Sequence, residues 1–80
     1  MRKVTLLTKP GCHLCDDART AVREVLDGLG MAEALEERSI LDDPALFDRH
    51  WDEIPVVLID GAVHTIYRVD RGRLAAALRS

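Results

Sequence analysis

The first thirty residues change abruptly from the pattern of a buried strand to that of an amphipathic helix. Residues Val4–Thr8 form a short apolar run rich in β-branched side chains, and Lys9–Gly11 ends it with turn-forming residues. From Leu14 to Leu29 apolar residues recur at helical spacing, and Gly28 and Gly30 act as stop signals. A strand that leads through a tight turn into a helix predicts an α/β unit.

The middle of the chain predicts a second strand and a short helix. Leu35–Ile40 follows the first strand and helix, so its position favours a strand parallel to the first one. Its Glu and Arg residues are poor strand formers, and here position outweighs propensity. Asp43 and Pro44 are typical of an N-cap followed by the first helical residue, which predicts a helix that ends near Trp51.

The last third of the chain predicts a β-hairpin and a final helix. Pro55–Ile59 is an apolar strand, and Asp60-Gly61 is a strong hairpin signal. Ala62–Tyr67 then returns as an antiparallel strand. Asp70 can cap a helix whose apolar positions are Leu74, Ala77 and Leu78.

These segments together predict an α/β fold with the order β-α-β-α-β-β-α. A four-stranded mixed sheet with helices on both faces accounts for every segment. A chain of 80 residues is too short for a second hydrophobic core, so we expect residues 1–80 to form a single domain.

Charge and hydropathy narrow the classes of partner. The formal net charge is −3, which gives no long-range attraction to nucleic acid. No run approaches the roughly 18 apolar residues of a membrane span, and the apolar start is too short for a secretory signal. We therefore expect a cytoplasmic monomer that binds neither nucleic acid nor membranes.

Two cysteines lie where the first strand gives way to the first helix. Cys12 and Cys15 are three residues apart, one helical turn, so both can lie on the same side of the helix. Unpaired backbone N–H groups at a helix start stabilise a thiolate, which favours Cys12 as the nucleophile. Cys15 can then attack a mixed disulfide formed at Cys12. This arrangement predicts a redox-active dithiol.

Three other interpretations of the cysteine pair stay open. Both cysteines could be buried structural residues. Zinc normally needs four ligands, and beyond the pair only His13, His50 and His64 are available, none in a paired spacing, although a metal shared across a dimer stays possible. The chain could also be a non-catalytic module that docks a partner at Ile54-Pro55.

The runs that carry this chemistry resemble two signatures of one family. Leu6–Cys15 is similar to the active-site segment of glutaredoxin-like proteins of the thioredoxin superfamily. Ile54–Gly61, an Ile-Pro pair followed by a strand and an Asp-Gly turn, resembles the second signature of that family. With the element order, the resemblance covers nearly the whole chain and is closest to small bacterial glutaredoxin-like domains.

The resemblance implies a role for several residues. Cys12 would be the attacking thiolate and Cys15 the resolving thiol. Pro55 matches the cis-proline of the family, which faces the dithiol and leaves the Ile54 backbone free to pair with an extended substrate. Lys9 matches a basic position that helps to bind an acidic thiol. No cofactor is implied beyond a small thiol as co-substrate.

The chain departs from the family pattern beside the dithiol and after the fourth strand. Glutaredoxins typically have Pro-Tyr between the cysteines, where this chain has His13-Leu14. They also have a Gly-Gly pair and then an aspartate that holds the γ-glutamyl end of glutathione. The corresponding stretch here is Tyr67–Asp70, in which Asp70 matches the aspartate and the side chains of Arg68 and Val69 are expected to fill the space that the glycines leave open. We therefore predict a thiol-disulfide oxidoreductase that reduces protein or small-thiol mixed disulfides, with weak dependence on glutathione.

Other conspicuous residues predict little chemistry. His50 and Trp51 end the short helix and are expected to be packed or exposed, and His64 is expected to be solvated. Three arginines lie near the start of the last helix: Arg68, Arg71 and Arg73. The simpler interpretation is that they form a solvated charged edge, and the alternative is that they bind a carboxylate of the substrate.

Overall fold

A computed structural model describes residues 2–79 of the chain. Its elements follow the order β-α-β-α-β-β-α, as predicted from the sequence, with two short 3-10 helices, η1 and η2, on either side of the second strand. Their bounds are β1 Val4–Thr8, α1 His13–Gly28, η1 Ala32–Ala34, β2 Leu35–Ser39, η2 Ile40–Asp42, α2 Pro44–His50, β3 Val56–Ile59, β4 Ala62–Ile66 and α3 Arg71–Arg79.

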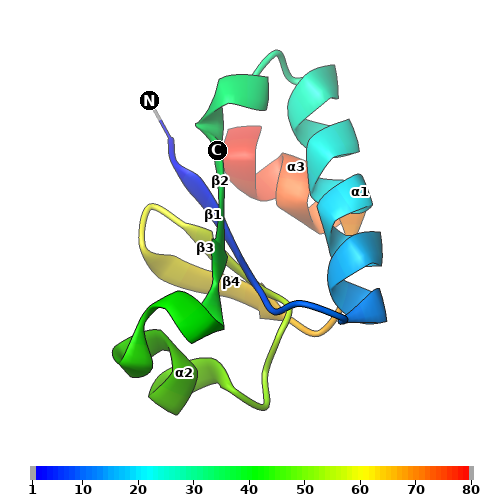
Figure 1. Cartoon of the computed structure of the whole chain (residues 1–80). Coiled ribbons are helices and arrows are strands. Elements are labelled where there is room, and N and C mark those ends of the chain that lie inside the picture. The colour runs from blue at the N-terminus through cyan, green and yellow to red at the C-terminus, as the bar shows by residue number, and fades with distance from the viewer. Residues whose placement is uncertain (1, 80) are drawn as a thin grey trace.

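The four strands form one mixed sheet in the order β2-β1-β3-β4. β1 is parallel to β2 and antiparallel to β3, and β3 is antiparallel to β4. α1 and α3 lie together against one face of the sheet, while η2 and α2 lie on the other side (Figure 1). The predicted mixed sheet with helices on both faces is confirmed.

β1 is buried along its whole length and contributes to a hydrophobic cluster on each face of the sheet. Val4 and Leu6 pack with α1 and α3, and Leu7 packs with η2 and the residues around the second cysteine. All five residues of β1 are buried. The strand can be covered on both sides because it pairs with a neighbour at each edge.

Several element boundaries differ from those expected from the sequence. α1 begins at His13, one residue earlier than predicted, and includes Gly28. β2 ends at Ser39 because the Ser39 side chain accepts a hydrogen bond from the Leu41 N–H at 3.1 Å, which starts η2. β4 ends before Tyr67, whose φ of 66° is incompatible with a strand.

The predicted hairpin turn is present between β3 and β4. Asp60 and Gly61 both have positive φ, as a tight two-residue hairpin turn requires. The Asp60 carboxylate also accepts a hydrogen bond from the Lys3 N–H at 2.8 Å, which ties the turn to the start of β1. Within residues 2–79 no helix is long and apolar enough to cross a membrane.

We predict that Leu6 and Leu41 differ sharply in their contribution to stability. Leu6 is fully buried in the cluster under α1, whereas Leu41 is 60% exposed. Leu6→Ala should lower the free energy of unfolding by about 2 to 5 kcal/mol because it leaves a cavity. Leu41→Ala should change it by less than about 1 kcal/mol. Urea unfolding followed by circular dichroism measures both, and equal effects would contradict the packing described above.

Candidate active site

Cys12 is the N-cap residue of α1. Its backbone is extended, with φ −96° and ψ 111°, and its sulfur accepts a hydrogen bond from the Cys15 N–H at 3.2 Å. Gly11, with φ 77°, makes the turn that brings the chain from β1 to this position. The Cys12 sulfur thus receives a hydrogen bond from the first turn of the helix, and this interaction stabilises negative charge on the sulfur.

Cys15 lies on the inner side of the same turn and is completely buried. Burial raises the pKa of the Cys15 thiol to about 11, and hydrogen bonding to Cys12 adds to this effect. The backbone N–H of Lys9 and the charge of Arg19 act in the opposite direction. The two sulfurs therefore differ: Cys12 is partly accessible, and Cys15 is a neutral, shielded thiol at physiological pH.

One of the predicted substrate-binding residues, Ile54, packs with the dithiol, and Pro55 follows it in the chain. The Ile54–Pro55 peptide bond is cis, as the resemblance implied, and both side chains are buried. Ile54 belongs to the hydrophobic cluster that includes Cys15, with Cys12 packed against it. Within residues 2–79, neither the N–H nor the C=O of Ile54 makes a hydrogen bond, so this backbone is free to pair with another chain.

The other two predicted residues lie on the turn before α1 and directly before α3. Lys9 is exposed on the turn that precedes Cys12. Asp70 caps α3, because its carboxylate accepts a hydrogen bond from the Arg73 N–H at 2.9 Å. The helix-cap interpretation of Asp70 is thus confirmed, while a role in substrate binding stays a prediction for both residues.

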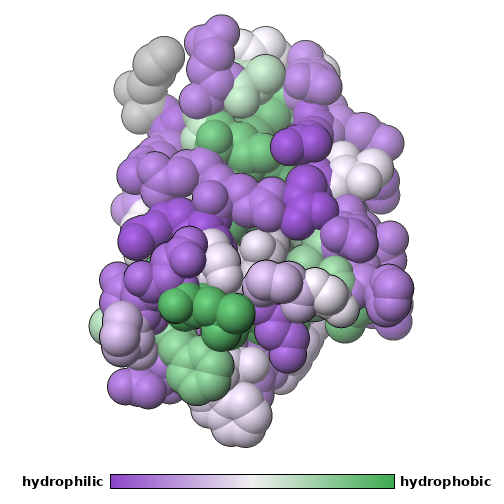
Figure 2. Space-filling model, viewed as in Figure 1, coloured by the Kyte–Doolittle hydropathy of each residue, from purple (hydrophilic) through white to green (hydrophobic). Residues whose placement is uncertain are grey.

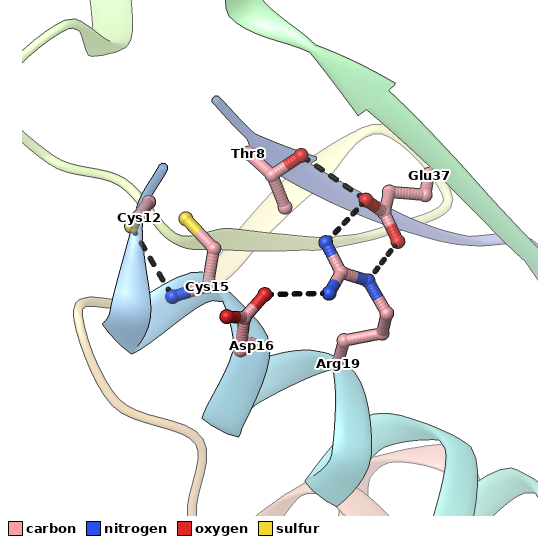
Figure 3. A network of polar contacts seen from close by, with 6 residues as sticks. All are labelled: Thr8, Cys12, Cys15, Asp16, Arg19 and Glu37. Atoms are coloured by element: carbon pink, nitrogen blue, oxygen red, sulfur yellow. Dashed lines mark hydrogen bonds and ion pairs between the residues drawn. The ribbon is translucent and has the colours of Figure 1, made fainter. Parts of the chain in front are cut away.

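A network of charged side chains beside Cys15 was not anticipated from the sequence. Figure 3 shows that the Arg19 guanidinium and the Cys15 sulfur both project from α1 toward the end of β1. Arg19 binds the Glu37 carboxylate through Nε and Nη2, at 2.6 and 2.7 Å, and Asp16 through Nη1 at 2.8 Å. Thr8, at the end of β1, donates its hydroxyl to Glu37 Oε2 at 3.2 Å, the same oxygen that accepts from Arg19 Nη2.

This network links α1 to the edge strand β2 and fixes a positive charge near the resolving thiol. Hydrogen bonds to Glu37 and Asp16 raise the pKa of Arg19, and Arg19 lowers the pKa of Glu37. Both partners stay ionised at neutral pH, so Glu37 is not a proton acceptor for Cys15. Two sequence signals point to the pair: Arg19 is four residues after Cys15 on the same helix face, and Glu37 is an acidic residue in a strand.

A pocket of about 480 Å³ lies beside the start of α1, between this helix and the segment that joins β4 to α3. Leu14 from α1 and Arg68 and Val69 from the joining segment contribute to its walls. Arg68 and Val69 therefore line the space rather than fill it. Arg71 is bound to Glu24 at 2.8 Å, which favours the interpretation of this residue as part of a charged edge.

The histidines outside the cysteine motif differ in their surroundings. His50 is buried, and its Nδ1 has no hydrogen-bond partner but lies 3.7 Å from a Glu53 carboxylate oxygen. His64 is half-buried rather than solvated, and burial, with a smaller effect of Arg73, lowers its pKa. Trp51 is 57% exposed. In the part of the chain that the structure describes, no group of three or more His, Cys, Asp or Glu side chains is arranged to hold a metal ion.

The chain is similar to a family of small glutaredoxin-like proteins. A family model described as "Glutaredoxin-like domain (DUF836)" matches residues 3–79. An uncharacterized protein of Mycobacterium tuberculosis is 34% identical over 77 residues, which span 92% of this chain and 79% of that protein. A protein of Mycobacterium bovis, also uncharacterized, matches with the same identity and coverage.

Solved structures of two bacterial proteins have the same fold. The X-ray structure of target protein XcR50 from X. campestris is 30% identical, with a TM-score of 0.75 and coverage of 95% of both chains. The solution structure of protein Ne2328 from Nitrosomonas europaea has a TM-score of 0.78, covers 95% of this chain and 89% of that one, and is 23% identical. At that identity the second match supports the fold alone.

We predict that alkylation distinguishes the two cysteines. At pH 8 iodoacetamide should label Cys12 and leave Cys15 free, because a thiol with a pKa of about 11 is ionised to only about one part in a thousand. Labelling of Cys15 in the folded Cys12→Ser protein should accelerate about tenfold per pH unit up to pH 10, since each unit multiplies the thiolate fraction by ten. Mass spectrometry of the labelled peptides measures this. Rapid labelling of Cys15 at pH 8 would show that the thiol is not shielded.

Proposed function

The chain belongs to the glutaredoxin-like domain family (DUF836), and we propose that it is a thiol-disulfide oxidoreductase whose redox centre is the dithiol Cys12–Cys15. The observation that supports this proposal most directly is the asymmetry of the pair. The Cys12 sulfur accepts a backbone N–H at the start of α1, while Cys15 is buried one turn further along. A nucleophilic sulfur beside a shielded resolving thiol is the arrangement that disulfide reduction requires.

The proposed reaction has two exchange steps. The Cys12 thiolate attacks one sulfur of the substrate disulfide, a Cys12–substrate disulfide forms, and the other substrate sulfur leaves as a thiolate that takes a proton from water. Cys15 then loses its proton to water, its sulfur attacks the Cys12 sulfur, and the second substrate sulfur leaves as a thiolate that also takes a proton from water. The substrate gains two electrons and two protons, the protein is left with a Cys12–Cys15 disulfide, and an external thiol must reduce it again.

The proposed substrates are protein disulfides or mixed disulfides of a small thiol. In this proposal Ile54 pairs through its free backbone with the extended segment that carries the disulfide, and Pro55 holds that backbone beside the dithiol. Lys9 and Asp70 would contact charged groups of the substrate. We further propose that the protein acts in the cytoplasm as a monomer, without nucleic acid or membrane partners.

We predict that replacing each of the two cysteines has a different effect on disulfide reduction. Cys12→Ser should abolish disulfide reduction because the attacking sulfur is lost. Cys15→Ser should instead accumulate a stable mixed disulfide at Cys12 because the resolving sulfur is lost. Mass spectrometry of each variant after incubation with a disulfide substrate shows which cysteine carries the adduct. Adducts on Cys15 in the first variant, with none on Cys12 in the second, would reverse the assignment.

We predict weak activity in a glutathione-coupled assay compared with a protein disulfide. Glutathione recognition in typical glutaredoxins uses open backbone after the fourth strand, and the pocket here is walled by Arg68 and Val69 instead. Positioning of the substrate supplies much of the rate, so Arg68→Gly with Val69→Gly should raise the glutathione-coupled rate. If the unmodified protein already matches an ordinary glutaredoxin assayed in parallel, the segment after β4 does not determine substrate choice.

A further inference from the structure

The short elements η2 and α2 leave large apolar side chains in solvent. Leu41 of η2, Phe47 of α2 and Trp51 at the C-terminal end of α2 are 60%, 43% and 57% exposed. These three residues are called here the apolar patch. Figure 2 shows apolar atoms gathered over η2 and α2, in the lower part of the view, with hydrophilic atoms around them.

The apolar patch follows from the way α2 packs on the sheet. The helix has only seven residues and turns Leu46 and His50 inward. Phe47 and Trp51 are four residues apart and therefore share the neighbouring, outward face. The backbone N–H of Trp51 donates to the Phe47 carbonyl at 2.9 Å, which continues the helical turn to Trp51. Large exposed apolar side chains that gather on one part of the surface are typical of a site that binds a partner.

The elements that carry the apolar patch are anchored beside the dithiol. Ile40 of η2 belongs to the hydrophobic cluster that contains Cys15 and Ile54, and Leu46 of α2 packs against that cluster. After Trp51 the chain reaches Ile54 within three residues. A segment that pairs with the free Ile54 backbone could therefore extend over the apolar patch.

Acidic side chains surround the apolar patch. Between residues 41 and 53 the chain carries five carboxylates, with Arg49 as the one permanently charged cation. Three of the carboxylates, Asp42, Asp48 and Asp52, are exposed and make no ion pair within residues 2–79. An apolar surface with an acidic border is complementary to an apolar segment that carries Lys or Arg.

We propose that the apolar patch docks the disulfide-bearing segment of protein substrates, and that this segment combines apolar residues with Lys or Arg near its cysteine. The inference rests on the proposed function and adds the substrate class to it. The apolar patch supplies the buried contact, the border carboxylates select basic segments and oppose acidic ones, and the Ile54 backbone aligns the segment with Cys12.

Trp51 is the sole tryptophan of the chain, so its fluorescence reports on the apolar patch directly. The probes are two tryptophan-free peptides in which Ser replaces the substrate cysteine. The basic peptide contains Leu, Ile, Lys and Arg, and in the acidic peptide Glu replaces each Lys and Arg. The first should shift Trp51 emission to shorter wavelength in a saturable way that salt weakens, and the second should not. Equal responses to both peptides, or no response to either, would overturn the proposal.

Matched variants separate the apolar patch from the rest of the surface. Asp48→Asn with Asp52→Asn should weaken binding of the basic peptide about fivefold, whereas Asp27→Asn with Glu33→Gln, which removes the same charge elsewhere, should not. Leu41→Ser should weaken binding by a similar factor, and Val63→Ser, at an exposed residue of β4, should leave it unchanged. Equal losses in a variant and its control would show that the effect is not local.

Two further measurements distinguish this inference from its alternatives. Reduction of bis(2-hydroxyethyl) disulfide, a small neutral disulfide, tests the dithiol alone and should be unaffected by the Leu41 and Asp48/Asp52 variants. If this compound is not reduced at all, the proposed function fails, whereas reduction without any preference for the basic peptide disulfide refutes only the docking inference.

Sedimentation at increasing concentration should show a monomer, and a dimer lost in Leu41→Ser would assign the apolar patch to a second copy of the chain instead.

Discussion

The burial of β1 on both faces of the sheet is the constraint on which the rest of the structure depends. The strand pairs with β2 on one side and β3 on the other, and its alternating side chains enter both hydrophobic clusters. β1 is paired at both edges and covered on both faces, so its path through the core is fixed as far as Thr8, where the strand ends. The position of Cys12 at the start of α1 is therefore fixed by the core rather than by a flexible loop.

The chemistry of the site follows from where this junction places each sulfur. Cys12 lies at the helix start, within reach of a backbone N–H, while Cys15 is turned into the cluster between β1 and η2. Two cysteines three residues apart in a fully solvent-exposed helix would have similar surroundings. Here burial raises the pKa of the Cys15 thiol, and the Arg19–Glu37 pair keeps a fixed charge beside it.

The sequence was sufficient to predict the element order, the parallel pairing of β1 with β2 and the β3–β4 hairpin, because hydrophobic period, turn dipeptides and position along the chain signal each of them. The cis-proline was implied by the resemblance of Ile54–Gly61 to a family signature. The Arg19–Glu37 pair was missed because it joins a helix residue to a strand residue, and only the packing of α1 on the sheet brings the two together. The exposure of Phe47 and Trp51 was equally hidden, since a helical pattern does not say how much of a short helix the sheet can cover. The positive φ of Tyr67 had no signal in the residue type, which ordinarily avoids it.

The charged composition that made β2 a poor candidate for a strand has a consequence for the behaviour of the protein in a crowded solution. β2 is an edge strand, and such an edge can add a strand from another molecule and start aggregation. Each of its three charged residues has an ionic partner in the same molecule: Glu36 with Lys3, Glu37 with Arg19, and Arg38 with Asp43. A strand arriving from outside would have to bury or displace these charges, so the sheet is protected from growing at this edge.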